Sequence, residues 1–141
     1  MMKQIPETEN ALVLRVDFSN QAGWEIICAT ILEPVGDLAF RANVEFLENA
    51  EYNGITQDQL LELIPANYAH SFIIVADSTV ISHPDHPLLI IDLYERSGRE
   101  FRAIPSQIQG IENNLSIANM DFEEFAESVD ESGVFRGFPE I

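Results

Sequence analysis

The chain has little cysteine: Cys28 is the only one in 141 residues. A single cysteine excludes an intramolecular disulfide and any Cys-x-x-Cys redox or zinc motif. Cys28 belongs to a set of apolar residues at helical spacing, namely Trp24, Ile27, Cys28, Ile31 and Leu32. This spacing places Cys28 on the inner face of a helix, where a lone thiol usually packs as a small hydrophobic side chain. We therefore expect an apolar core to hold the fold together, since a domain of this length needs neither a disulfide nor a metal.

Basic residues are scarce as well. Seven Lys and Arg stand against 24 Asp and Glu, which gives a formal net charge of -17. This charge repels nucleic-acid phosphates and anionic lipid headgroups, so we expect neither nucleic acid nor a membrane surface as a partner. A basic protein is a better candidate. The alternative is that the acidity serves only solubility.

Long apolar segments are also missing. No run approaches the roughly 20 residues that span a bilayer. The first ten residues lack the basic start and the apolar stretch of a signal peptide, so we expect a cytoplasmic protein. The length predicts a single globular domain over residues 11–138, preceded by a disordered or loosely packed N-terminus at residues 1–10.

The hydrophobic pattern predicts one α/β domain with a mixed sheet of about five strands in the order β-α-β-α-β-β-β-α. The expected strands cover residues 12–18, 40–46, 72–76, 88–93 and 100–104. The expected helices cover residues 20–32, 56–64, 104–115 and 121–129. Two of these segments, 72–76 and 88–93, are apolar runs without alternation, which suits strands at the centre of the sheet that are covered on both faces. The layout resembles that of thioredoxin-like domains, but the chain lacks their cysteine pair.

Local signals support these boundaries. Thr56 with Gln59, and Asp121 with Glu124, have the spacing of a capping box at a helix start. We expect the first two strands to pair in parallel across a helix and the last three to form an antiparallel meander.

Acidic and imidazole side chains follow two of the expected strands. Asp17 and Asp77 each close a strand, and the loop after the second carries His83, Asp85 and His86. If these strands are parallel, the five side chains share the sheet edge where open α/β sheets place their crevices, and they could hold a divalent metal. The alternative is that they stabilise plain turns.

Other catalytic signatures are absent from the sequence. It contains no phosphate-binding Gly-x-x-x-x-Gly-Lys, no Gly-x-Ser-x-Gly and no His-Glu-x-x-His. We therefore expect no cofactor, and a protein that is not an enzyme is the better interpretation. The arginines around residues 96–102 could form an anion site or pair with neighbouring carboxylates.

Three segments carry a family resemblance: Leu-Arg-Val-Asp-Phe at 14–18 followed by Trp24, Pro-Leu-Leu-Ile-Ile-Asp-Leu-Tyr at 87–94, and residues 111–138 with their Gly-Val-Phe-Arg-Gly-Phe end. Together they resemble a bacterial family of domains of unknown function, over roughly residues 11 to 138. The resemblance marks as motif residues Arg15, Trp24, Asp92, Asn113, Asn114, Asn119, Asp121 and Arg136. The asparagines suit either helix caps or a polar ligand.

Three functions remain open at this point. The first is a small acidic, non-catalytic binding protein of the inhibitor or immunity type that masks a basic partner. The second is a metal-assisted hydrolase or metal-binding domain that uses the Asp and His side chains. The third is a homo-oligomeric interaction domain that pairs through a sheet edge or through the aromatic tail at Phe135 and Phe138.

Overall fold

Six strands form one mixed sheet in the computed structural model, which describes residues 2–94 and 98–138. The strands are β1 (Ala11–Arg15), β2 (Val44–Leu47), β3 (Phe72–Ala76), β4 (Leu88–Asp92), β5 (Glu100–Ala103) and β6 (Val134–Phe135). Their order across the sheet is β2-β1-β3-β4-β5-β6. β1 pairs in parallel with β2 and β3, while β4 is antiparallel to both β3 and β5. The predicted mixed α/β domain is confirmed, with one more strand than expected.

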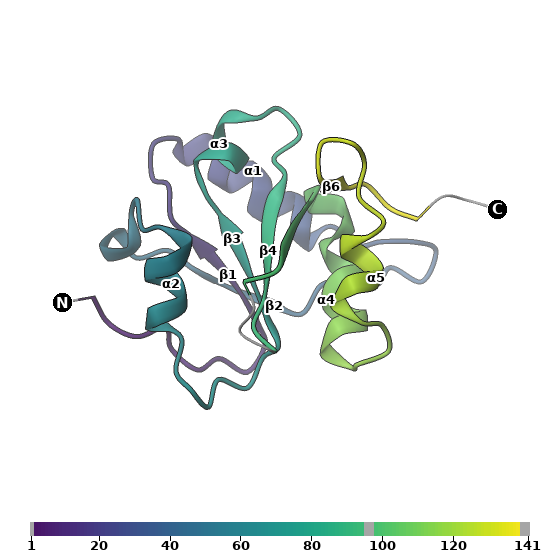
Figure 1. Ribbon diagram of the computed structural model, residues 1–141. Coiled ribbons are helices and arrows are strands. Elements are labelled where there is room, and N and C mark those ends of the chain that lie inside the picture. Colours follow the sequence, from purple (N-terminus) through teal and green to yellow (C-terminus); the bar gives the residue numbers. More distant parts are fainter. Residues whose placement is uncertain (1, 95–97, 139–141) are drawn as a thin grey trace.

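Helices cover both faces of this sheet (Figure 1). Within the described residues they are α1 (Gln21–Leu32), α2 (Gln57–Leu63), α3 (Ser78–Ser82), α4 (Ile108–Ser116) and α5 (Phe122–Ala126), with two short 3-10 helices at Ala50–Tyr52 and Pro105–Gln107. Apolar residues of α1, α4 and α5 pack on one face, and residues of α2 pack on the other. The result is a three-layer domain with a core on each side of the sheet.

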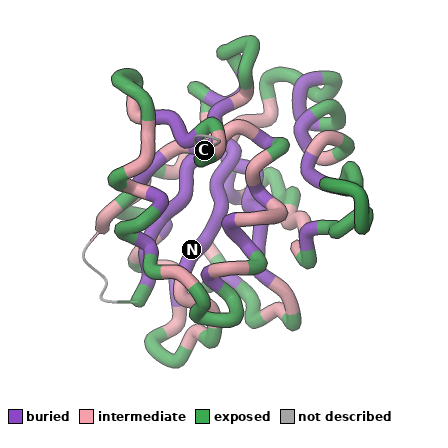
Figure 2. Tube along the Cα trace, turned by 90° about the vertical axis from the view of Figure 1, so that its right-hand side faces the viewer, coloured by how far each residue is buried: buried purple, intermediate pink, exposed green. Residues whose placement is uncertain are grey.

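The three central strands are buried along their whole length. Every residue of β1, β3 and β4 is buried, and the strands form the buried centre in Figure 2. Successive side chains enter opposite cores: Val13 and Ile74 face α1, whereas Leu14 and Ile73 face α2. Burying an aliphatic side chain of this size contributes about 1.5–3 kcal/mol. The segments predicted as central strands, 72–76 and 88–93, are therefore central strands, the second ending at Asp92.

Caps begin α1, α2 and α5 where the sequence predicts helices, whereas α4 begins at Ile108 instead of residue 104 and α5 ends at Ala126 instead of residue 129. The α2 capping box has both bonds, because the Thr56 side chain accepts from the Gln59 amide and the Gln59 side chain accepts from the Thr56 amide. Asp121 and Glu124 form the same box at the start of α5. At α1 the capping residue is Asn20, whose side chain accepts from the backbone N–H of Gly23.

The segment before β1, which we expected to be disordered or loosely packed, makes contacts with the rest of the domain. Ile5 is buried, and its amide donates to the Leu63 carbonyl at 2.8 Å. The Tyr52 hydroxyl donates to the Lys3 carbonyl at 2.8 Å, and a ring nitrogen of His70 lies 2.7 Å from the Thr8 carbonyl oxygen. These bonds join the segment to α2 and to the start of β3.

The second strand is shorter than the predicted 40–46. β2 begins at Val44, because its register pairs Val44 to Leu47 with Ala11 to Leu14 of the short strand β1. Phe40 lies outside the sheet, in an isolated bridge with Val35, and is 55% exposed. Two short elements were not predicted, namely α3 and β6. No helix among the described residues is long and apolar enough to cross a membrane.

Candidate functional site

Asp17 and Asp77 lie at the same end of the sheet, beyond the carboxyl ends of β1 and β3, as the parallel pairing of these strands predicts. A hollow of about 410 Å³ lies between them, and Ser19, Asn53 and Ser78 also line it. Both carboxylates already have protein partners, however. Asp77 receives two hydrogen bonds from the Arg102 guanidinium, at 3.0 and 2.8 Å. Asp17 accepts from the amide and the hydroxyl of Ser19, at 2.8 and 2.6 Å.

The loop after α3 directs its polar groups into turns. The His83 ring accepts a hydrogen bond from the Asp85 amide at 3.1 Å, and a His86 ring nitrogen lies 2.7 Å from the Val80 carbonyl oxygen. In residues 2–94 and 98–138, no three His, Cys, Asp or Glu side chains are placed to hold a metal ion. The structure thus brings Asp17 and Asp77 to one edge but does not assemble the five candidates into a metal site.

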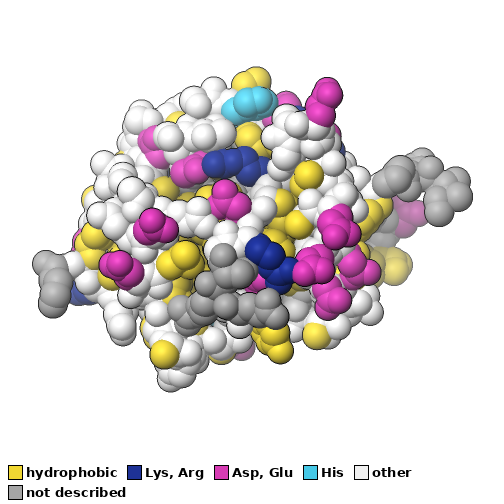
Figure 3. Space-filling model, in the orientation of Figure 1, with side chains coloured by type: hydrophobic (Ala, Val, Ile, Leu, Met, Phe, Trp, Pro, Cys, Tyr) yellow, Lys and Arg dark blue, Asp and Glu magenta, His cyan; other side chains and the backbone are white. Residues whose placement is uncertain are grey.

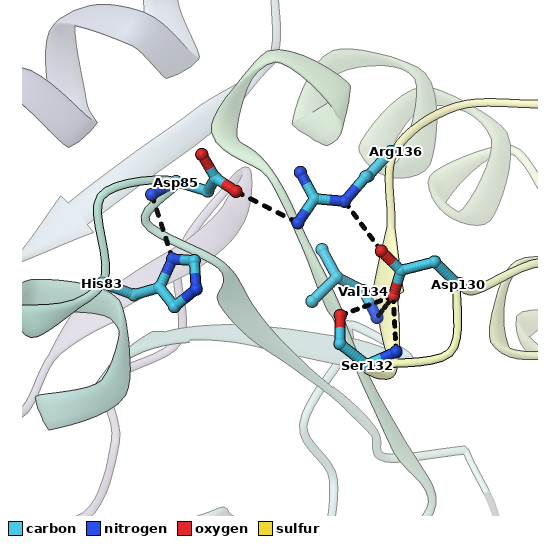
Figure 4. A network of polar contacts seen from close by, with 6 residues as sticks. All are labelled: His83, Asp85, Asp130, Ser132, Val134 and Arg136. Atoms are coloured by element: carbon cyan, nitrogen blue, oxygen red, sulfur yellow. Dashed lines mark hydrogen bonds and ion pairs between the residues drawn. The ribbon is translucent and has the colours of Figure 1, made fainter.

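Asp85 instead belongs to an ion network with the C-terminal tail (Figure 4). Arg136 lies between two carboxylates, with Nη2 3.1 Å from Asp85 Oδ2 and Nε 2.8 Å from Asp130 Oδ2. Hydrogen bonds from Ser132, Arg136 and the Val134 amide hold the pKa of Asp130 below its usual range. Arg136, a residue of the resemblance motif, therefore fastens the tail to the loop at residues 83–87.

Arg15 and Trp24 form a second structural network. Arg15 is buried, donates to Gln21 Oε1 at 2.8 Å, and stacks over the Phe18 ring at 4.3 Å. Glu48 completes the network, because it accepts from Trp24 Nε1 at 2.5 Å and lies 3.8 Å from Arg15 Nη1. A guanidinium can be buried only with such partners. These motif residues join β1 and α1 to the chain beyond β2.

Cys28 lies on α1 and is half-buried, less than its predicted place on the inner face implies. Burial, together with the nearby Glu48 carboxylate, raises the pKa of the Cys28 thiol to about 11. The thiol is therefore almost fully protonated at neutral pH, and a protonated thiol is a poor nucleophile. Cys28 behaves as a packing residue.

Asn114 and Asn119 close the end of α4. The Asn114 side chain donates to the Gly110 carbonyl at 2.8 Å, and Asn119 donates to the Asn114 side-chain oxygen at 2.8 Å. The Asn114 carbonyl also accepts from the Asn119 amide at 2.9 Å. These two asparagines shape the turn between α4 and α5. Asn113 differs, because its side chain is exposed and has no hydrogen-bond partner in the described part of the chain.

A larger hollow lies at the opposite end of the sheet from Asp17 and Asp77. It has a volume of about 940 Å³ and runs between the amino ends of β1 and β3 and the α4–α5 connection. We call it the α4–α5 groove. It is lined by residues 9–11, 43, 69–72, 92, 94, 99, 112, 113, 115–118 and 120–123.

Two buried carboxylates line the α4–α5 groove. In the described chain the buried charged side chains are Arg15, Asp92 and Glu112, and the last two both line this groove. Asp92 Oδ2 accepts from Arg99 Nε at 3.0 Å and from Nη2 at 2.5 Å, and Arg99 also pairs with Glu123. Arg99 pairs with Asp92 and Glu123, and Arg102 pairs with Asp77, which agrees with the second of the two predicted alternatives for these arginines. Arg96, the remaining arginine of the predicted cluster, lies outside the described residues.

Glu112 has a different environment. Its Oε1 accepts from the Asn43 amide at 2.7 Å, and its Oε2 accepts from the Ser116 hydroxyl at 2.8 Å. No Lys or Arg in residues 2–94 and 98–138 forms an ion pair with it. Sequence reasoning missed Glu112, although a signal was present: it lies four residues after Ile108 and next to Ile111, on the apolar side of α4.

Comparison with known proteins shows which family this is. Residues 10–138 match the family model described as Domain of unknown function (DUF6924). The chain belongs to this family. No curated protein matches the chain. Within the DUF6924 domain, three of the motif residues named from the sequence, Asp92, Asn113 and Asp121, line the α4–α5 groove.

Proposed function

We propose that this chain is a small acidic, non-catalytic binding protein, cytoplasmic and of the inhibitor or immunity type, whose partner is a basic protein. The observation that carries the proposal is how the positive charges are used. Four arginines in the described chain, Arg15, Arg99, Arg102 and Arg136, form ion pairs with carboxylates of the same domain. Few cations are therefore left to offset the remaining acidic side chains of a chain with net charge -17.

Acidic side chains also gather at one place on the surface. On the face shown in Figure 3, they cluster over α5, beside the α4–α5 groove. α5 carries Glu123 and Glu124 in its first turn, and Glu127 follows at its end. Carboxylates grouped in this way attract a cationic surface and speed its association.

The polar groups at the end of the sheet opposite the α4–α5 groove favour binding over catalysis. Asp77 is held by Arg102, Asp85 by Arg136, and the ring of His86 by a backbone carbonyl. Groups held in this way stabilise the fold, and a general base or metal ligand would have to leave its partner first.

Salt dependence of capture tests the proposal. The immobilised protein is exposed to a lysate of its source organism at about 0.1 M and about 1 M salt, where the Debye length falls from roughly 10 to 3 Å. We expect a basic protein to be retained at low salt and released at high salt. The products of the neighbouring genes, purified singly, are the first candidates for a direct binding measurement. Retention of no basic protein, or retention unaffected by salt, would refute the proposal.

A further inference from the structure

The α4–α5 groove is negatively charged at its rim and in its depth. Its lining contains five carboxylates, those of Glu9, Asp92, Glu112, Asp121 and Glu123, and one guanidinium, that of Arg99. Arg99 is already paired with Asp92 and Glu123. The charge that remains without a counter-ion in the described groove is therefore acidic.

Glu112 is the decisive residue. Glu112 is only 4% exposed. The two hydrogen bonds that its side chain accepts nevertheless come from neutral groups, the Asn43 amide and the Ser116 hydroxyl. A carboxylate offers about four acceptor sites, so acceptor capacity remains. Burying a carboxylate is costly unless a cation compensates it. A cation supplied from outside the domain would provide that compensation.

The floor of the groove suits an aliphatic stem. Leu115, Phe72 and Phe122 line it, together with Met120, and each of the first three is at most 8% exposed. Lysine and arginine place their methylene stems along apolar surfaces and their charged ends against polar groups. A volume of about 940 Å³ lies at the upper end of the range for ligand sites, so it admits such a side chain with its flanking residues.

We infer that the α4–α5 groove receives an arginine or lysine side chain of the partner protein, and that Glu112 neutralises its charge. The inference rests on the proposed function, because it names where and how the basic partner would be held. Asn113, which follows Glu112 in the chain, is exposed and also lines the groove, so its side-chain amide supplies a further hydrogen-bonding group for the partner.

The test is an NMR titration of the whole chain with N-acetyl-arginine amide at low salt, with N-acetyl-citrulline amide as the neutral compound of the same shape. We expect arginine, and not citrulline, to shift the backbone amide signals of Asn43, Glu112 and Asn113. Glu112→Gln keeps an oxygen acceptor for the Asn43 amide but removes the charge. It should weaken arginine binding about tenfold or more, the usual contribution of a charged hydrogen bond.

The matched control is Glu62→Gln, which removes one exposed carboxylate from α2, on the other face of the sheet. It should leave arginine binding unchanged. If Glu112→Gln fails to fold, Asn113→Lys is used instead, because Asn113 is exposed and the substitution should not disturb the core. The ammonium that the substitution introduces should occupy the groove and block arginine binding. Unchanged arginine binding by Asn113→Lys would overturn the inference.

The outcomes separate this inference from the proposed function. In one outcome, arginine shifts signals over the whole acidic surface, and Glu62→Gln weakens binding as much as Glu112→Gln does. This outcome would overturn the inference about the groove but not the proposal of an acidic binding protein. The same holds if arginine causes no shift while a basic partner is captured in a salt-dependent way. Failure to capture any basic partner overturns the proposed function itself.

Discussion

Truncation of Phe125 tests the packing that fixes α5 and the wall of the groove. Phe125 is 1% exposed, and its ring packs against three others: Phe101 at 6.2 Å, Phe135 at 5.3 Å and Phe138 at 5.5 Å between centroids. Replacing a buried Phe by Ala typically costs about 3–5 kcal/mol. Because three aromatic contacts are lost at once, and each contributes about 0.5–1.5 kcal/mol, we expect Phe125→Ala near the upper end of that range.

The size of this effect is easy to measure. Domains are stable by about 5–15 kcal/mol, so Phe125→Ala should remove a large part of the free energy of unfolding and lower the Tm by roughly 10–20 °C. Urea unfolding gives the free energy, and an unchanged m-value shows that unfolding is still two-state.

Two other phenylalanines provide a scale for the result. Phe122 is 8% exposed, and its ring packs against that of Phe101 at 5.0 Å, so Phe122→Ala should cost less, about 3 kcal/mol. Phe138 is 47% exposed, and Phe138→Ala should cost the least of the three. A loss below about 1 kcal/mol for Phe125→Ala, or a loss no larger than that for Phe138→Ala, would refute the reasoning.

Three more predictions concern the tail, the metal hypothesis and acid stability. Deleting residues 133–141 should lower the Tm without changing the oligomeric state, because Val134 and Phe135 are buried in the same chain. An unchanged Tm, or dissociation of a dimer, would contradict docking of the tail. Zinc or manganese should not raise the Tm, since Asp77 is already bound by Arg102; a rise that His83→Ala abolishes would restore the metal site. Asp130→Asn should destabilise the protein at neutral pH, and its difference from the wild type should shrink as the pH falls below about 4, because the pKa of Asp130 is lower in the folded than in the unfolded state; a difference that stays constant in acid unfolding would exclude this coupling.

Much of the fold could be predicted because its signals are local. The apolar runs at 72–76 and 88–93 are too short for helices and became central strands. Both capping boxes are visible as side chains three residues apart, and both helices begin there. β6 could not be found in this way, because two residues carry no period and their pairing with β5 depends on the tail.

The site was harder to predict, because it depends on partners far apart in the sequence. The hydrophobic pattern alone places Asp17 and Asp77 at the same end of the sheet. It cannot show that Arg102, 25 residues further along the chain, binds the Asp77 carboxylate. The bond between Glu112 and the Asn43 amide spans 69 residues. The crevice rule for α/β sheets directed attention to the carboxyl ends of the strands, whereas the larger groove lies at the amino ends of β1 and β3.

Competition for the captured partner tests the central claim most directly. A basic protein retained by the immobilised chain is challenged with N-acetyl-arginine amide, with N-acetyl-citrulline amide as the control, and capture is repeated on Glu112→Gln and Glu62→Gln. Arginine should release the partner and citrulline should not, and of the two variants only Glu112→Gln should lose capture. Equal retention by Glu112→Gln and the wild type, with no release by arginine, would contradict it.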